Sequence, residues 1–258
     1  GLLVVLAGRA VKLSPWFSGC DKRYTGRIKL GEETDTLDPD GKVIARAKPC
    51  SREAFESALA AFRGEILQAP PEYSALHING TRAHLLARRG INPKMEKRPV
   101  AIYSLSLVSW EPPFAGIDVH CSKGTYIRSL ARDIALAAGS RAHLSALTRT
   151  AVGGFLLKDA VSPPDAGPGE DGQETFRKAL MPPGPELFRR LDIPSLEIGE
   201  KEAAAVSHGG SLRFLEEGAV PSAILALFHG GVLAAVTEKK DGSWSYGYVA
   251  GTKAGPPY

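Results

Sequence analysis

The segment with the clearest chemical potential is Cys121–Arg128, which reads Cys-Ser-Lys-Gly-Thr-Tyr-Ile-Arg. The pattern predicts a strand that ends in a glycine turn and is followed at once by a helix. Backbone N–H groups at a helix start favour an anion, and glycine lets a ligand approach the backbone. Lys123 adds a point charge, and Arg128 can hold a carboxylate through two hydrogen bonds. Taken alone, the segment is explained at least as well by an ordinary strand–helix junction with a solvated lysine.

A second segment combines an aromatic ring with basic charge. Asp21–Tyr24 reads Asp-Lys-Arg-Tyr and opens Lys22–Leu30, where polar and apolar residues alternate as in a half-buried strand. A tyrosine beside Lys and Arg suits an RNA base that stacks while its phosphates are neutralised. The alternative is a strand tyrosine whose ring packs in the core, and this segment alone favours the alternative.

Residues 70–98 have the features of an RNA-binding arm. Pro70-Pro71 interrupts the chain, and a basic stretch with little apolar periodicity follows. Its basic side chains are Arg82, His84, Arg88, Arg89, Lys94, Lys97 and Arg98. A solvated, flexible loop is the alternative interpretation of such a charge run.

The charge balance differs between the two parts of the chain. Residues 1–160 hold 23 Lys and Arg against 15 Asp and Glu, whereas residues 161–258 hold 9 against 13. A basic N-terminal part suits a polyanionic partner, although ordinary solvated charge also produces such a balance.

Composition narrows the class of protein. The 258 residues, of which 43% are hydrophobic, suffice for a large domain with a smaller one. A run of about 18 apolar residues that could span a membrane is missing. The cysteines Cys20, Cys50 and Cys121 lie far apart without C-x-x-C spacing, which predicts reduced thiols in a cytoplasmic protein. The histidines do not cluster with them, so no metal site is expected.

These segments must be positioned by strands and helices that alternate without regular βαβ spacing, which predicts an α+β fold with a mixed or antiparallel sheet. A short helix or turn that ends near Pro15 is expected at Ala10–Phe17, and helices are expected from Ser51 and at Tyr126–Ala138 with a stop at Gly139. Strands are expected at Gly1–Leu6, Lys22–Leu30, Val100–Trp110, Gly116–Cys121, Ala223–Val236 and Trp244–Ala250. A turn-rich loop is expected at Thr34–Lys42 and a linker at Ser162–Gly172.

Together, four segments in order resemble the TruB-type tRNA pseudouridine synthases. They are DKRYTGRIKLGEETDTLDPDGKV, PPEYSALHINGTRAHLLARRG, CSKGTYIRSLARDI and LTRTAVGGF. The resemblance implies a pseudouridine synthase core at residues 1–180, with a thumb insertion at about 70–98. A weaker similarity over residues 193–249 implies a small β-rich, PUA-like RNA-binding domain at 190–258.

The resemblance also implies roles for single residues. The target base leaves the RNA stack, its N-glycosidic bond is cleaved, and the uracil rotates and rejoins through carbon without a cofactor. Tyr24 matches the tyrosine that stacks on this base, and Arg128 matches the arginine that pairs with the catalytic aspartate. The predicted catalytic residues are therefore Tyr24 and Arg128, and the predicted substrate-binding residues are Tyr126, Leu147, Lys123 and Arg149.

Two departures from the family pattern stand out. His77 occupies a place where the thumb signature has Lys. The family nucleophile lies in a Gly-Thr-Leu-Asp-Pro segment that is expected before Gly1, and so the nucleophilic aspartate is expected to be absent from this chain. Asp38 lies in a similar Thr-Leu-Asp-Pro segment but follows Tyr24, and we interpret it as part of an ordinary acidic turn. Arg128 is then expected to lack its carboxylate partner.

The sequence thus predicts a tRNA pseudouridine synthase that isomerises the T-loop uridine (uridine-55), with Tyr24 and Arg128 in one pocket. The alternative, from another class, is a non-catalytic module that binds the tRNA T arm or assists its folding. The chain as it stands is expected to bind tRNA without turning it over.

Overall fold

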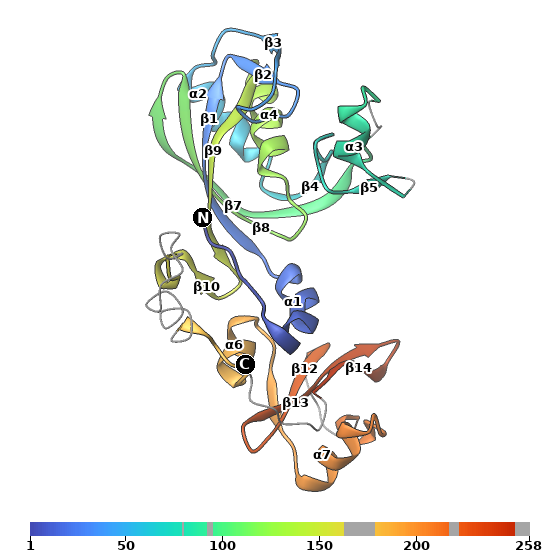
Figure 1. The fold of residues 1–258 in the computed structure, drawn as a ribbon. Coiled ribbons are helices and arrows are strands. Elements are labelled where there is room, and N and C mark those ends of the chain that lie inside the picture. The colour runs from blue at the N-terminus through green and yellow to red at the C-terminus, as the bar shows by residue number, and fades with distance from the viewer. Residues whose placement is uncertain (79, 92–94, 163–178, 217–221, 251–258) are drawn as a thin grey trace, which may run out of the picture. The chain divides into compact units, whose positions relative to one another are not determined.

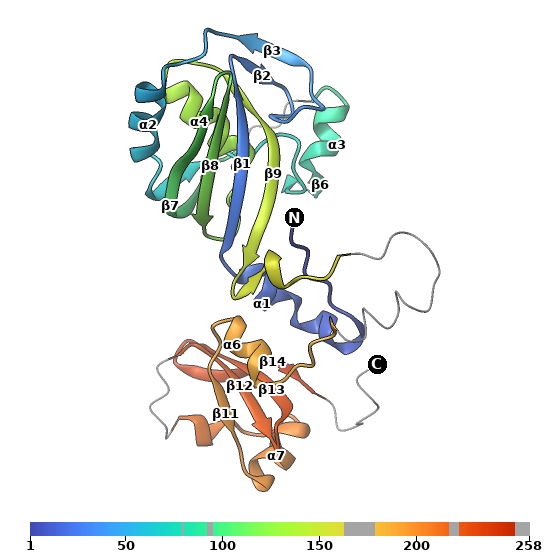
Figure 2. The ribbon, with the colours of Figure 1, turned by 90° about the vertical axis from the view of Figure 1, so that its left-hand side faces the viewer.

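The computed structural model describes residues 1–78, 80–91, 95–162, 179–216 and 222–250. The chain packs as two compact units (Figures 1 and 2). The first unit comprises Gly1–Leu2 and Asp21–Val152, and the second comprises Leu3–Cys20 and the described residues from Gly153 onward. The functional division at 1–180 and 190–258 stays a prediction. The packing units are cut differently, because Leu3–Cys20 packs with the second unit.

The first unit is built on an antiparallel sheet with the strand order β9-β1-β8-β7-β4. Its strands are β1 (Lys22–Leu30), β4 (Gly64–Gln68), β7 (Arg98–Glu111), β8 (Phe114–Cys121) and β9 (Ala142–Val152). The predicted α+β class with an antiparallel sheet is confirmed.

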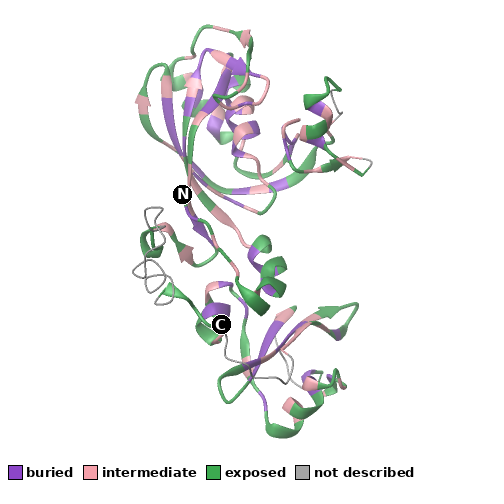
Figure 3. Ribbon diagram, viewed as in Figure 1, coloured by how far each residue is buried: buried purple, intermediate pink, exposed green. Residues whose placement is uncertain are grey.

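Alternation along β1 fixes which face of the sheet is covered. Gly26, Ile28 and Leu30 are buried, whereas Thr25 and Arg27 are exposed. The buried face packs against α2 (Arg52–Ala60) and α4 (Ile127–Ala137), whose apolar residues complete one core cluster, visible as purple ribbon in Figure 3. As predicted, Ser51 caps α2 by accepting a hydrogen bond from Ala54 N at 3.3 Å. Gly139, with φ 75°, follows the end of α4.

Two excursions leave this sheet. β2 (Glu32–Thr34) and β3 (Val43–Arg46) form a hairpin around an acidic turn. Between β4 and β7, the described part of the predicted arm contains β5 (His77–Ile78), β6 (Thr81–Arg82) and α3 (Ala83–Arg88), which stand to one side of the sheet in Figure 1. Asn79 and residues 92–94 of this arm lie outside the described residues.

The second unit contains the predicted small β-rich part. Its sheet has the order β11-β12-β13-β14. The described elements of this unit are η1 (Gly8–Leu13), α1 (Ser14–Gly19), β10 (Phe155–Leu156), η2 (Leu157–Asp159), α6 (Pro185–Arg190), β11 (Ser195–Glu197), α7 (Glu200–Ser207), η3 (Arg213–Leu215), β12 (Ile224–His229), β13 (Val232–Lys240) and β14 (Ser243–Val249). The predicted strand at 223–236 is really two strands, because Gly230-Gly231 adopts positive φ and turns the chain. Most of the predicted linker at 162–172 lies outside the described residues.

Two predictions near the N-terminus are wrong. Gly1–Leu6 is not a strand: Leu2 N bonds to Arg149 O at 2.8 Å, but Val4 and Leu6 pack into a core cluster of the second unit instead of continuing a ladder. Pro15 does not end a helix but lies in the first turn of α1, where its missing N–H is tolerated. None of the helices among the described residues has the length and apolar character needed to cross a membrane.

Candidate active site

The site centres on the guanidinium of Arg128, in the first turn of α4. Its Nη1 donates to Asp38 Oδ2 at 2.7 Å and to Thr36 O at 3.0 Å. Its Nη2 donates to Tyr73 O at 2.9 Å. One arginine therefore joins the start of α4 to the acidic turn after β2 and to Tyr73, in the N-terminal end of the arm, which we call the root of the arm. The expectation that Arg128 lacks a carboxylate partner is wrong, because the turn brings Asp38 to it.

The backbone of the acidic turn explains how Asp38 reaches this position. Leu37 adopts a left-handed conformation, with φ 61°, which costs a non-glycine residue about 1 kcal/mol. Its N–H bonds to Thr34 O at 3.1 Å, and its carbonyl accepts from Leu144 N at 3.1 Å. The Leu37 side chain is buried. Burial and both hydrogen bonds hold the strained residue, which turns the Thr36 carbonyl and the Asp38 carboxylate toward Arg128.

The Asp38 carboxylate is engaged at both oxygens. Besides the bond from Arg128, its Oδ1 accepts from Thr36 Oγ1 at 2.5 Å and from Asp40 N at 3.3 Å. The Arg128 and Asp38 side chains are 27% and 28% exposed, so water screens the pair less than a surface pair. Hydrogen bonds of this kind fix the direction of the carboxylate. The arrangement suits an orienting group better than an attacking one.

Tyr24 lies on the same face of the sheet as this cluster. Tyr24 packs against the core cluster that contains Ile127 of α4, the helix that carries Arg128. The two predicted catalytic residues are therefore on one face, as a shared pocket requires. That they serve one base stays a prediction.

The neighbours of Tyr24 come from β9. Tyr24 is opposite Arg149 and Gly26 is opposite Leu147, so the two predicted β9 residues share the face of Tyr24. Leu147 is 44% exposed despite its apolar side chain. Arg149 Nε donates to Leu2 O at 2.8 Å, which fixes its direction. An exposed leucine beside a tyrosine and an arginine offers a stacking surface with a charged edge.

The environment of Tyr24 keeps its hydroxyl neutral. Burial raises the pKa of Tyr24 above its ordinary value, and a hydrogen bond with Arg149 offsets part of this rise. The ring therefore presents a neutral phenol around neutral pH, which suits stacking against an uncharged uracil.

The remaining predicted residues flank the start of α4. Lys123 is exposed on the turn before the helix, where Gly124 adopts φ 81°. Tyr126 is the N-cap residue of α4, and its backbone is held by the side chain of Gln68 at the end of β4.

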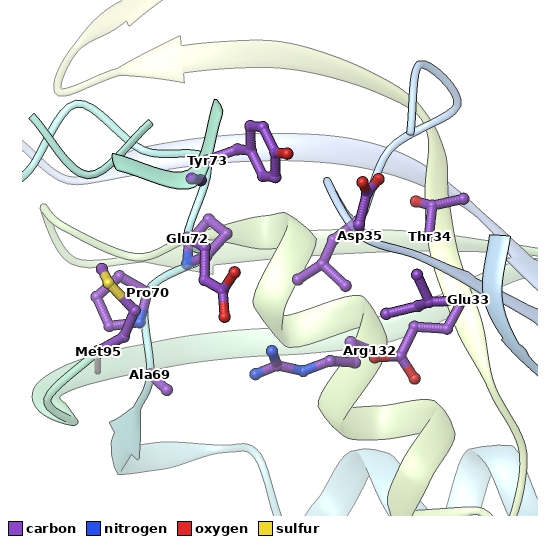
Figure 4. Close-up of a pocket in the computed structure, with 13 residues that line it drawn as sticks. Glu33, Thr34, Asp35, Ala69, Pro70, Glu72, Tyr73, Met95 and Arg132 are labelled. Carbon is purple, nitrogen blue, oxygen red and sulfur yellow. The ribbon is translucent and has the colours of Figure 1, made fainter. Parts of the chain in front are cut away.

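A cavity of about 610 Å³ adjoins the Arg128 cluster (Figure 4). It lies between the turn after β2, the root of the arm and the second turn of α4. Figure 4 shows Glu72, Asp35 and Arg132 around it. Its lining residues are Glu33, Thr34, Asp35, Leu37, Ile44, Ala69, Pro70, Pro71, Glu72, Tyr73, Ala87, Met95 and Arg132. Donors and acceptors on opposite walls could hold the polar edge of a nucleobase.

Metal and thiol chemistry find little support in the described residues. They contain no group of three or more His, Cys, Asp and Glu side chains that could hold a metal ion. None of the three cysteines takes part in a disulfide among the described residues. Burial raises the pKa of Cys121 to about 11, so this thiol is protonated and unreactive at neutral pH.

Sequence reasoning missed three contributors to the site. Asp38 was noticed but assigned to an ordinary turn, and the left-handed Leu37 that directs it leaves no mark in residue type. Tyr73 contributes only its carbonyl, which no sequence pattern reveals. Of the three, Gln68 is the residue whose type could have pointed to a role. It is a buried carboxamide at a strand end, and such a group needs partners for its donor and its acceptor.

Sequence comparison connects this geometry to known proteins. The family model described as TruB family pseudouridylate synthase (N terminal domain) matches residues 1–127. The tRNA pseudouridine synthase B of Chromobacterium violaceum is 42% identical over 215 residues, which cover 83% of this chain and 69% of that protein. The tRNA pseudouridine synthase B of an Azoarcus species is 41% identical over 245 residues, covering 94% of this chain and 79% of that protein.

Structural comparison extends the likeness of the fold beyond the family model. A chain in the crystal structure of a Cbf5–Nop10–Gar1 complex matches with a TM-score of 0.64 and 24% identity, covering 95% of this chain and 69% of that chain. An archaeal box H/ACA Nop10–Cbf5 complex matches with a TM-score of 0.61 and 20% identity, covering 95% and 70%.

Proposed function

Because the chain belongs to the TruB family of pseudouridylate synthases, we propose that it isomerises a uridine of tRNA to pseudouridine and that the target is the T-loop uridine, uridine-55. The reaction breaks the bond between uracil N1 and ribose C1′, turns the base and joins its C5 to C1′. C5 loses its proton and N1 gains one, so the product is an isomer of the substrate. We also propose that the protein is located in the cytoplasm.

The Arg128–Asp38 pair at the start of α4 is the observation that carries the proposal. It puts a directed positive charge on the sheet face that carries Tyr24. In the proposal Tyr24 stacks on the flipped uracil, Tyr126 and Leu147 line the base pocket, and Lys123 and Arg149 contact the RNA backbone or the base edge. Stacking and charge together offset the few kcal/mol that flipping a base costs.

The proposal gives Asp38 an orienting role. Both of its oxygens accept hydrogen bonds, and a carboxylate held in this way is a weak nucleophile. The attacking group in the proposal is a second aspartate, the nucleophile that the family resemblance implies. Arg128 would then contact two carboxylates. Asp38 would fix the direction of the guanidinium, and the guanidinium would orient the attacking carboxylate.

The test is tritium release from a T-arm stem-loop RNA labelled at C5 of uridine, because the C5 proton leaves in every turnover. The 258-residue chain, its Asp38→Ala variant and the full-length protein are compared. We expect release by the full-length protein alone. Release by the short chain that disappears in Asp38→Ala would make Asp38 the nucleophile. Tight RNA binding without release by any of these proteins would favour the non-catalytic T-arm module.

A further inference from the structure

We infer that Gln68 is a positioning residue of this site: its carboxamide fixes the backbone of Tyr126, and with it Arg128, relative to the root of the arm. The inference rests on the proposed function for its kinetic consequences and on the geometry alone for its structural ones.

The contact between Gln68 and Tyr126 is a closed pair of hydrogen bonds. Gln68 Oε1 accepts from Tyr126 N at 2.8 Å, and Gln68 Nε2 donates to Tyr126 O at 3.1 Å. The Gln68 side chain is almost fully buried, at 2% exposure. The carboxamide therefore binds the backbone N–H and C=O of one residue, as the residue opposite it in an antiparallel strand would, in a place that water hardly reaches.

The position of Gln68 gives this contact its importance. Gln68 is the last residue of β4 and pairs with Arg98, the first residue of β7, so it lies where both ends of the arm leave the sheet. Tyr126 is the N-cap residue of α4, and its side chain makes no capping bond. Gln68 therefore supplies a partner for an N–H group at the helix start.

A second contact runs in parallel. Arg128 Nη2 donates to Tyr73 O, five residues after Gln68 in the root of the arm. The start of α4 is thus held to the arm root at two points, one through the Tyr126 backbone and one through the Arg128 side chain. Without the Gln68 contact, the hydrogen bond from the Arg128 guanidinium to Tyr73 O is the one of these two that remains. The group that must orient a carboxylate would then also have to hold the arm.

Glutamine fits this place because its neutral carboxamide offers a donor and an acceptor in one plane. An ionised glutamate has only acceptors, so it keeps the bond from Tyr126 N but sets an oxygen against Tyr126 O. A protonated glutamate regains a donor and restores both bonds. Gln68→Glu therefore makes the contact depend on pH, whereas Gln68→Met removes it at every pH with little change in size.

The kinetic experiment compares full-length Gln68→Glu, Gln68→Met and wild type on T-arm RNA at several pH values between about 5 and 8.5, a range that covers a carboxyl pKa raised by burial. We expect kcat of Gln68→Glu, relative to wild type, to fall roughly tenfold to a hundredfold as pH rises, with KM nearly unchanged. Gln68→Met should be low throughout. Leu67→Glu is the matched control, because it adds a carboxylate on the adjacent, exposed residue of β4 and should follow wild type.

Wild-type kcat in a folded Gln68→Met protein would overturn the inference. So would a loss confined to KM, or the same pH dependence in Leu67→Glu.

A structural readout separates this inference from the proposed function. In the 258-residue chain, the Tyr126 amide should exchange with solvent at least about tenfold faster in Gln68→Met than in wild type, while Leu130 N, bonded to Tyr126 O at 3.0 Å, keeps its protection. If the wild-type enzyme makes no pseudouridine, the proposed function fails, and accelerated Tyr126 exchange still supports the positioning contact. Unchanged exchange overturns it.

Discussion

Arg128 donates a hydrogen bond to Asp38 across 2.7 Å, although the two residues are 90 positions apart in the chain. The bond joins the first turn of α4 to a turn between β2 and β3. Neither residue can be moved without changing the other's surroundings, and so Asp38 is the most informative place to perturb the site.

Asp38→Asn should lower kcat roughly tenfold to a hundredfold in the full-length protein, because a charge-assisted hydrogen bond contributes about 1.5–3 kcal/mol to holding Arg128 in place. The free energy of unfolding should fall by only about 1 kcal/mol or less, since the pair is partly solvated. Tritium release and urea unfolding measure the two quantities. Asp40→Asn, an exposed carboxylate two residues along, is the control and should change neither. Full activity in Asp38→Asn would show that Arg128 is held adequately by Thr36 O and Tyr73 O.

Tyr24→Phe and Tyr24→Leu should differ. The phenylalanine keeps the ring, so RNA binding and the pH profile of kcat between about 6 and 9 should match wild type, because the pKa of Tyr24 is raised above its ordinary value of about 10. The leucine removes the stacking surface and should cost about 1–3 kcal/mol in transition-state binding. The raised pKa of Tyr24 also makes the stability of the folded state depend on pH. The free energy of unfolding falls only as pH rises past the pKa of the tyrosine in the unfolded chain. Equal kcat/KM for the two variants would remove Tyr24 from the base pocket.

Gly41→Ala should disturb the acidic turn. A Cβ at Gly41 would overlap Thr36 Oγ1 and Asp35 Oδ1 and would lie 2.9 Å from Thr36 N, so the backbone itself must shift. We expect a loss of about 1–3 kcal/mol in the free energy of unfolding, together with a lower kcat, because the same turn directs Asp38. Gly19→Ala is the control, since nothing lies within 4 Å of its added Cβ. A stable, fully active Gly41→Ala protein would mean that the turn adapts without moving Asp38.

Deleting residues 76–96 should weaken tRNA binding and flatten its dependence on salt. The predicted basic arm contributes phosphate contacts, and each lost contact lowers the slope of log K against log salt by about 0.7–0.9. Titrations of T-arm RNA at several salt concentrations measure the slope. Because the deletion leaves Tyr73 and Gln68 in place, the contacts to Arg128 and Tyr126 should survive. An unchanged slope would show that the arm does not bind phosphates.

Much of the fold could be predicted from the sequence, because local signals decide it. The alternation at Lys22–Leu30, the cap at Ser51 and the glycine at 139 each predicted an element that the structure contains. The prediction of a strand at Gly1–Leu6 was wrong because an apolar run indicates that side chains are buried but not which elements bury them. Here the buried side chains belong to a core cluster away from the sheet ladder.

The site was predictable only where it coincides with sequence motifs. Tyr24 and Arg128 lie in segments whose residue types suit RNA or an anion, whereas Leu147 was found only through the family resemblance. The structure puts Tyr24, Leu147 and α4 on one face of the sheet. The Arg128–Asp38 pair was not found, because it depends on the φ of Leu37 and on a hydrogen bond from β9. A backbone angle set by tertiary contacts is invisible to any reading of residue types along the chain.

The left-handed Leu37 also couples the local opening of the acidic turn to that of β9. Its carbonyl holds the Leu144 amide at 3.1 Å, and the same bond helps to keep a conformation that relaxes once the bond is gone. Release of the Leu144 amide therefore frees the turn, and a freed turn withdraws Asp38 from Arg128. The exchange rate of this one amide, on a strand that carries neither partner of the ion pair, reports how often the site falls apart.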